Sequence, residues 1–153
     1  MSNEPILSPL FDMQIQLSPN RELIGATPHG LRANVYVHEG VVAGPRLRGT
    51  VRPGGADWFT IRPDGVGELD VRVTLEVDNG LVYGQLHGLL EVGGVGTTPG
   101  APAQLPPKIE GTVTGRYETG SADHAWLHRL QIVGRVTVDT VAWTVHYRLF
   151  SLA

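Results

Sequence analysis

Residues 67–78 read GELDVRVTLEVD and alternate almost without a break between apolar and polar side chains. Successive side chains of a β-strand point to opposite faces of the sheet, so this segment has one aliphatic face and one polar face. The aliphatic face carries Leu69, Val71, Val73, Leu75 and Val77. The polar face carries Asp70 and Arg72, and it is either a solvated surface or the polar wall of a site. The pattern predicts a long strand and not a helix.

The composition agrees with a small β-protein. A length of 153 residues predicts one domain over residues 1–153 with a single core. The 20 glycines and 11 prolines suit many strands joined by tight turns. The net charge of -3 argues against a nucleic-acid partner, and the absence of cysteine excludes disulfides, iron–sulfur clusters and a thiol nucleophile.

The beginning of the chain carries no targeting signal. Residues 1–14 lack the basic start and apolar run of a signal peptide, and no stretch approaches the roughly 20 apolar residues that span a bilayer. We therefore expect a cytoplasmic protein with no membrane partner, in which residues 1–10 form an N-terminal arm.

Alternating apolar runs recur between clusters of Gly, Pro, Asn and Asp, as is typical of an all-β barrel or sandwich. The expected strands cover residues 11–17, 32–40, 42–51, 57–62, 67–77, 81–91, 108–118, 125–133 and 140–149. The sequences RPDG at 62–65 and DNG at 78–80 are strong turn signals, so the central strands should be neighbours in a meander. We expect no helix of ordinary length.

One long segment interrupts this pattern. Residues 92–107 are mostly Gly, Pro, Thr and Ala and show no periodicity. Loops of this length are lids, binding loops or disordered surface, so we expect either a lid over a barrel mouth or a flexible surface loop. No capped helix follows the glycines, which argues against a nucleotide-binding loop.

Six blocks occur in order along the chain. They are GVVAGPRLRG at 40–49, RPGGADW at 52–58, RPDG at 62–65, LDVRVTLEVDNG at 69–80, RYETG at 116–120 and AWLHR at 125–129. Together they resemble the domain-of-unknown-function 3237 family of small bacterial β-barrel proteins, from about residue 25 onward. The resemblance implies a closed, mostly antiparallel meander barrel similar to allene oxide cyclase, with a ligand inside and neither a metal nor an organic cofactor. It implies no settled activity.

Three residues are candidates for acid or base chemistry. If Asp70 and Arg72 face the barrel interior, burial raises the pKa of Asp70 toward that of a general base, and Arg72 can stabilise an enolate-like oxygen. The alternative is an outward polar stripe with the valines inside. His128 stands where the family pattern carries Asn, so it is either an acid or base or a structural histidine.

Five further residues are candidates for ligand binding. Trp58 and Trp126 are either aromatic walls of a pocket or core filling, and Trp126 would share a strand face with His128. Tyr83 and His87 would line one face of a strand as hydrogen-bond donors. Asp57 follows a glycine turn and either caps that turn or contributes to the site.

Metal binding and serine hydrolysis find little support. His87, His128 and His146 converge only if strands distant in sequence become neighbours, and neither an H-x-H pair nor an HExxH run is present, so we expect no metal site. The G-x-S-x-G motif of a nucleophilic serine is also absent.

Three functional hypotheses follow. The first is a cofactor-independent isomerase, cyclase or lyase for an apolar or aromatic carbonyl compound, with Asp70 or His128 as base or acid and Arg72 and Tyr83 as oxyanion donors. The second is a carrier barrel without catalysis. The third is an assembly module in which the aliphatic face of 67–78 points outward and is covered by another subunit. A homo-oligomer, most simply a dimer, is compatible with all three.

Overall fold

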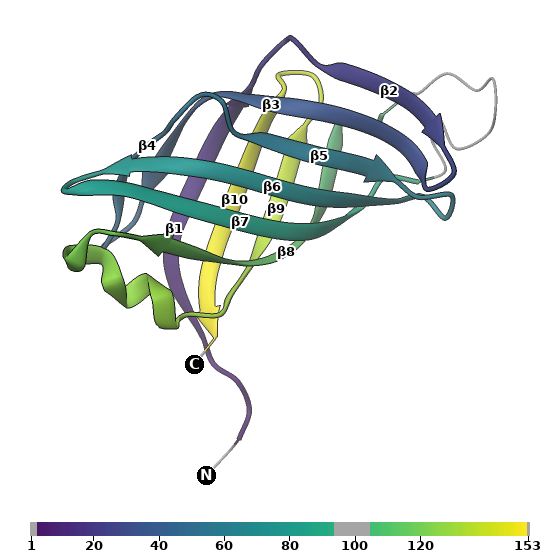
Figure 1. The fold of residues 1–153 in the computed structure, drawn as a ribbon. Helices are drawn as coiled ribbons and strands as arrows, with labels where there is room; N and C mark the ends of the chain where they lie inside the picture. Colours follow the sequence, from purple (N-terminus) through teal and green to yellow (C-terminus); the bar gives the residue numbers. More distant parts are fainter. Residues whose placement is uncertain (1–2, 94–104, 153) are drawn as a thin grey trace.

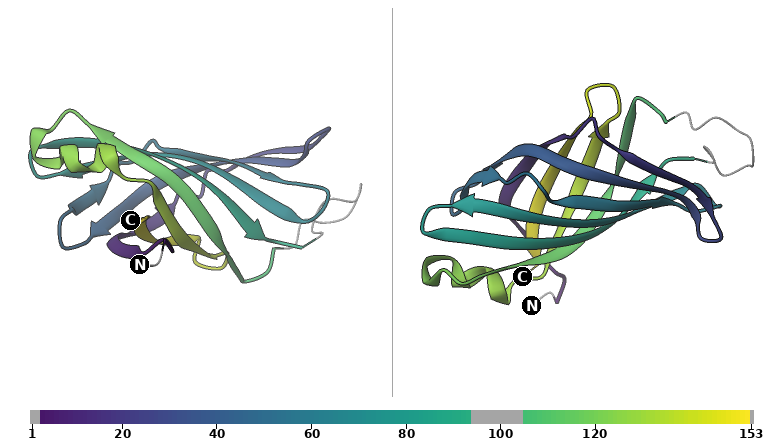
Figure 2. Two further views of the ribbon diagram at one scale, coloured as in Figure 1. Left: turned by 90° about the horizontal axis from the view of Figure 1, so that it is seen from below. Right: turned by 45° about the horizontal axis from the view of Figure 1, so that its top comes forward.

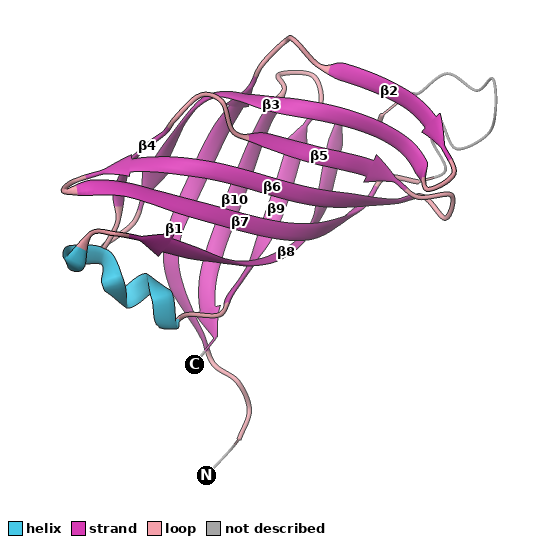
Figure 3. Cartoon of the chain, in the orientation of Figure 1, coloured by secondary structure: helices cyan, strands magenta, loops and turns pink. Residues whose placement is uncertain are grey.

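In the computed structural model, which describes residues 3–93 and 105–152, the strands close into an antiparallel β-barrel (Figure 1). The strands are β1 (Leu7–Leu17), β2 (Glu22–Thr27), β3 (Gly30–Ala43), β4 (Arg48–Val51), β5 (Ala56–Ile61), β6 (Val66–Val77), β7 (Gly80–Glu91), β8 (Lys108–Thr119), β9 (Ile132–Asp139) and β10 (Thr144–Leu152). Within the described ranges, the one helix is a 3-10 helix, η1 (Ala122–Arg129) (Figure 3). The predicted all-β antiparallel barrel is confirmed.

The barrel has eight strand positions, and the pairing of β1 with β3 closes it. β4 and β5 share one position, because both pair with β3 on one side and with β6 on the other. β1 and β2 likewise follow one another along β3, but only β1 also pairs with β10. Beyond the end of β1, the wall therefore lacks a continuous ladder between β2 and β10.

The strand β6 settles which face of the central sheet is inside. Leu69, Val71, Val73 and Leu75 are buried in the barrel, and the polar side chains between them lie outside. Burying an aliphatic side chain stabilises the fold by about 1.5–3 kcal/mol, whereas an inward carboxylate and guanidinium would lose their hydration. The inward polar wall and the exposed aliphatic face for assembly are therefore both wrong. The homodimer stays a prediction, and an exposed aliphatic face on β6 no longer supports it.

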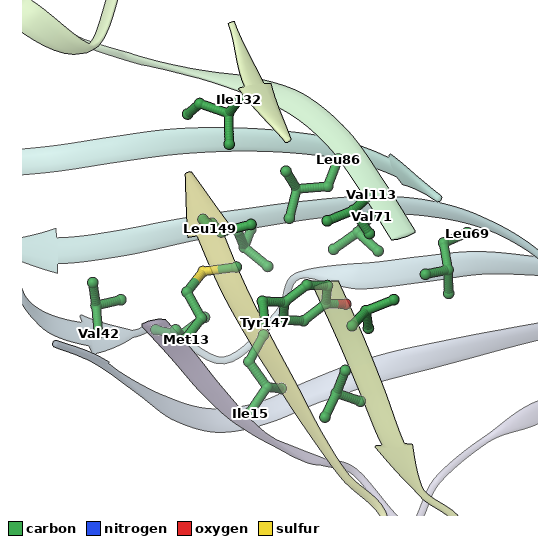
Figure 4. Close-up of a cluster of buried hydrophobic side chains, with 14 of the residues drawn as sticks. Met13, Ile15, Val42, Leu69, Val71, Leu86, Val113, Ile132, Tyr147 and Leu149 are labelled. Atoms are coloured by element: carbon green, nitrogen blue, oxygen red, sulfur yellow. The ribbon is translucent and has the colours of Figure 1, made fainter. Parts of the chain in front are cut away.

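One end of the barrel is filled by large side chains. Tyr117 is fully buried, its hydroxyl donates to Met13 Sδ at 3.3 Å, and its ring packs edge-on against Phe11. Gly84 on β7 leaves room for this ring, because a Cβ there would lie 2.3 Å from Tyr117 Cε1. Figure 4 shows Met13 and Leu149 among the aliphatic side chains of the interior. This end of the barrel is a packed core and not a pocket.

The helix η1 occupies part of the segment where a strand over 125–133 was predicted, and that prediction is wrong. Asn79 in the β6–β7 turn donates to Asp123 at 2.6 Å, and a ring nitrogen of His124 lies 2.8 Å from the Asp78 carbonyl oxygen. These contacts hold η1 beside the β6–β7 turn (Figure 2). Leu127 is fully buried, so the helix adds an apolar side chain to the filled end of the barrel.

Smaller differences concern strand boundaries. The strand expected over 42–51 is interrupted between the end of β3 and the start of β4, β2 was not expected, and β1 extends back into the predicted N-terminal arm. Residues 94–104, most of the predicted lid, lie outside the described residues, so the lid stays a prediction. In the described part of the chain, no helix is long and apolar enough to cross a membrane.

Candidate functional site

A cavity of about 470 Å³ lies inside the barrel, and no residue of η1 is among the residues that line it. Its size is in the range of small-molecule sites, about 300–1,000 Å³. Aliphatic side chains from β1, β3, β5, β6, β7, β8, β9 and β10 form most of its wall. The described lining residues that carry a polar or charged group are Arg21, Asp57, Thr140, Trp143 and Tyr147.

Asp57 is the one carboxylate among the described residues that line this cavity. It lies on β5 between Val35 of β3 and Val71 of β6, and both valines also line the cavity. The next residue, Trp58, points to the outside of the barrel, where its ring packs edge-on against Tyr36 with centroids 5.9 Å apart. Strand alternation thus turns the carboxylate inward and the indole outward.

The two oxygens of Asp57 have different surroundings. Oδ1 accepts a hydrogen bond of 2.9 Å from the backbone amide of Asp70. This amide is available because the β5–β6 pairing includes Ala56, Asp57, Thr60 and Ile61 but skips the two residues between. Oδ2 has no hydrogen-bond partner within the described ranges. One oxygen anchors the carboxyl group to the wall, and the other remains open to a ligand.

Burial raises the pKa of Asp57 from 3.8 to about 7. The Asp70 amide lowers this pKa, the nearby Asp70 carboxylate raises it, and the Arg32 guanidinium lowers it, but loss of hydration is the largest effect. A carboxyl group with this pKa populates both its charged and neutral forms near neutral pH. It can therefore accept a proton and return it, which general acid–base catalysis requires.

Tyr147 provides a hydroxyl group to the same cavity. The residue is buried on β10, and its hydroxyl forms no hydrogen bond in the part of the chain that the structure describes. Burial raises the pKa of Tyr147 well above its usual value of 10, and the negative charge of Asp57 raises it further. The hydroxyl thus stays protonated and can donate to a ligand oxygen. Figure 4 shows the ring inside the barrel, with its oxygen on the side where Leu69 and Val71 lie.

The predicted catalytic pair lies outside the barrel. Asp70 Oδ1 is 3.8 Å from both Arg72 Nε and His87 Nδ1, and the side chains of Arg72 and His87 are 51% and 58% exposed. These groups form a polar stripe on the outer face of β6 and β7, in which Asp70 Oδ1 is shielded from solvent. The inward placement that their predicted roles in catalysis and binding required is wrong.

The other predicted residues also lie away from the cavity. Tyr83 and His128 border a shallow surface hollow, and His128 Nε2 accepts a hydrogen bond of 3.0 Å from the Thr119 amide. Trp126 packs from η1 against the filled end of the barrel, under the guanidinium of Arg46 at 3.8 Å. The shared strand face of Trp126 and His128 does not exist, because both are on the helix. Asp57 is therefore the one predicted site residue that lines the cavity.

The sequence interpretation missed Tyr147, Arg21 and Trp143. Alternation in TVHYRLF at 144–150 predicts that Tyr147 shares a face with aliphatic neighbours, so this signal was available. Arg21 and Trp143 lie in connections between strands, where no periodicity indicates the direction of a side chain.

Histidines do not gather into a metal site in the described ranges, where no group of three or more His, Cys, Asp or Glu residues has a suitable arrangement. His146, the third histidine considered, lies with its Nε2 atom 2.8 Å from Asp12 Oδ2. The cavity offers one carboxylate among its described lining residues, which is a poor donor set for a metal ion.

Comparisons with known proteins place the chain in a family of proteins of unknown function. A model for a family described as protein of unknown function (DUF3237) matches residues 5–152. A UPF0311 protein from Rhodopseudomonas palustris is 30% identical over 123 residues, which cover 76% of this chain and 80% of the relative.

Solved structures agree on the fold. A β-barrel-like protein from Acinetobacter baumannii has a TM-score of 0.82 and 24% identity, with coverage of 100% of this chain and 99% of that one. An enzyme from Penicillium herquei has a TM-score of 0.69 and 17% identity, with coverage of 100% and 98%. At these identities the structural likeness shows the fold alone. The predicted similarity to allene oxide cyclase stays a prediction.

Proposed function

This chain belongs to the DUF3237 family of proteins of unknown function, and from that premise we propose that it is an enzyme for an apolar or aromatic carbonyl compound. The reaction proceeds by proton transfer inside the barrel and is of the isomerase, cyclase or lyase type. The observation that carries this proposal is the Oδ2 atom of Asp57, which has no hydrogen-bond partner in the described chain and lies in an otherwise largely aliphatic cavity. A carboxyl group turned into a largely aliphatic cavity without a full set of partners is costly to folding, so a functional reason for keeping it is needed.

The two polar groups have complementary roles in this chemistry. The Asp57 carboxylate removes a proton from the carbon next to the substrate carbonyl, and the Tyr147 hydroxyl donates a hydrogen bond to the oxygen that becomes negative. In an isomerase reaction, Asp57, now neutral, returns the proton to another carbon of the same molecule, so substrate and product are isomers. The raised pKa of Asp57 matches it to this exchange, and the raised pKa of Tyr147 keeps its proton in place.

The proposal is tested by hydrogen exchange, which needs no knowledge of the product. The protein is incubated in deuterium oxide with a panel of β,γ-unsaturated cyclic ketones and aryl alkyl ketones, and deuterium at the carbon beside the carbonyl is followed by NMR. We expect Asp57→Asn to slow enzyme-dependent exchange by about 10²–10⁴-fold, the usual contribution of a general base. Asp70→Asn is the matched control and should stay within about tenfold of wild type, because its side chain lies outside the barrel while its amide remains. Equal exchange by wild type and Asp57→Asn would contradict the proposal.

A carrier without catalysis is the second candidate, and the predominance of aliphatic side chains in the cavity wall favours it. Native mass spectrometry of protein purified from its own cells distinguishes the two. A carrier retains a bound apolar compound that is recovered unchanged after long incubation and binds equally to Asp57→Asn. The same spectrum gives the mass of the assembly, and we propose a homodimer.

A further inference from the structure

The mouth of the cavity carries a positive charge. Arg21, in the connection between β1 and β2, lines the cavity, and its guanidinium carbon lies 3.6 Å from the centroid of the Trp143 ring. Trp143 comes from the β9–β10 turn and lines the cavity as well. Stacking on an aromatic ring fixes the plane of a guanidinium while leaving its N–H donors at the edge available.

Arg21 and Trp143 lie where the strand pairing of the barrel wall is interrupted. The β1–β10 ladder ends at the pair Gln16 and Thr144, and β2 pairs only with β3. Two hydrogen bonds connect the turn that contains Trp143 to β1. The backbone carbonyl oxygen of Trp143 accepts one from the Leu17 amide at 2.9 Å and one from Gln16 Nε2 at 3.2 Å. Arg21 and Trp143 thus lie beside the break in strand pairing between β2 and β10, and two hydrogen bonds to β1 hold the Trp143 turn in position.

The charge of Arg21 has no acidic partner among the described residues. Its neighbour Glu22 is engaged elsewhere, because it accepts hydrogen bonds from Tyr36 at 2.6 Å and from Asn34 at 3.2 Å. Arg21 is the one cationic side chain that lines the cavity in the described part of the chain. An unpaired, oriented guanidinium at the rim of an apolar cavity is suited to an anionic group on a ligand.

The cavity differs between its rim and its interior, which fixes the orientation of a charged ligand. Trp143, Val145 and Tyr147 all line it, and β10 advances roughly 10 Å from its start at Thr144 to Tyr147, so Trp143 and Tyr147 lie at different depths. Val35 and Val71 flank Asp57 in the wall, and a second negative charge there would be repelled by the carboxylate. An anionic ligand therefore enters with its apolar part first and leaves its charge at Arg21.

We infer that the ligand of this barrel is an elongated apolar carboxylic acid whose carboxylate binds Arg21 at the rim, while its reacting carbonyl reaches Asp57 and Tyr147. This inference rests on the proposed function for the reacting end, but the rim contact is independent of catalysis. A carboxylate is the favoured anion, because its two oxygens match the planar fork of the guanidinium. Arg21 is thus a specificity residue that selects acids over neutral molecules of equal length.

The test compares two probes of equal chain length with different head groups, the carboxylate of 8-phenyloctanoate and the neutral hydroxyl of 8-phenyloctanol, by calorimetric titration. We expect wild type to bind the acid about tenfold more tightly than the alcohol, and Arg21→Gln to remove that preference through weaker binding of the acid. Added salt should weaken acid binding and not alcohol binding. Arg46→Gln is the matched control, since Arg46 stacks on Trp126 at 3.8 Å but does not line the cavity, and it should leave both affinities unchanged.

The outcomes separate the two proposals. Equal affinity for acid and alcohol in wild type, or an equal loss of the preference in Arg46→Gln, would overturn the role of Arg21 and leave the exchange chemistry of Asp57 standing. Binding of neither probe would overturn the ligand class, and the ketone exchange assay then decides separately whether Asp57 acts as a base. Retention of the acid preference by Arg21→Gln would likewise refute the inference.

Discussion

The Asp57→Asn variant should change how the stability of the barrel depends on pH. The pKa of Asp57 is about 7 in the folded protein and has an ordinary value of 3.8. Between these values the folded chain binds more protons than the unfolded chain, so the free energy of unfolding of wild type falls as pH rises. Asparagine keeps a similar shape and an oxygen for the Asp70 amide but does not titrate, so its contribution stays constant.

The size of the effect follows from the pKa difference. One pKa unit corresponds to 1.36 kcal/mol, so the complete shift is worth roughly 4 kcal/mol. Relative to low pH, wild type has lost stability equivalent to about 1.2 pKa units at pH 5 and about 3.2 pKa units at pH 8, according to the linkage relation. Between these two pH values wild type should lose roughly 2–3 kcal/mol relative to Asp57→Asn. Effects of other carboxylates cancel in this comparison.

The measurement is urea unfolding at pH 5 and pH 8 for wild type, Asp57→Asn and Asp64→Asn. Asp64 is the matched control, because its ion pair with Arg62 lowers the pKa of Asp64 to about 2, so its stabilising effect is lost only as pH falls below about 4. The difference between wild type and Asp64→Asn should be flat from pH 5 to pH 8. A difference between wild type and Asp57→Asn that is equally flat would refute the claim that this carboxyl group is desolvated in the cavity.

Three further substitutions test the remaining parts of the account. Tyr147→Phe removes a hydroxyl without a partner in the described chain, so ketone exchange should fall by about 10²-fold while the free energy of unfolding changes by less than about 1 kcal/mol in urea titration. Gly84→Ala places a Cβ 2.3 Å from the ring of Tyr117, and denaturation should show a loss of about 1–3 kcal/mol that a second change, Tyr117→Leu, relieves. Leu127→Ala shortens the fully buried side chain of η1 and should cost about 2–5 kcal/mol, with binding of 8-phenyloctanol to the cavity, which Leu127 does not line, unchanged by calorimetry.

The fold was predictable from sequence because its longest strands obey the simplest rule. In β6 every second residue is aliphatic, and burying that face outweighs any other arrangement of the strand. The turn at Asn79 and Gly80 was equally clear, since both residues adopt the positive φ angles that an Asn-Gly hairpin requires. These local signals fix neighbouring strands, and closure of the barrel follows from their number and order.

The helix η1 could not be predicted by the same rule. Its sequence ADHAWLHR contains one fully buried residue, Leu127, and a short apolar run without clear helical periodicity. Its position depends on Asp123 and His124 meeting the β6–β7 turn, which lies more than 40 residues earlier in the chain. A contact of that range is decided by the closed barrel and not by the segment itself.

The site itself was obscured because β5 inverts the usual pattern. In this strand a carboxylate faces the interior and an indole faces the outside, whereas burial energies alone would favour the reverse for Asp57 and Trp58. The neighbouring strands enforce the inversion, since Val35 and Val71 pair with Asp57 and bring it to their own inward face. A strand that turns its acid toward the interior and its aromatic ring toward the outside loses stability in return for something other than folding, and such conflicts between local preference and fold concentrate at functional sites. The conflict therefore makes Asp57 the candidate, while the regular alternation of β6, which first drew attention to Asp70 and Arg72, is typical of a structural strand.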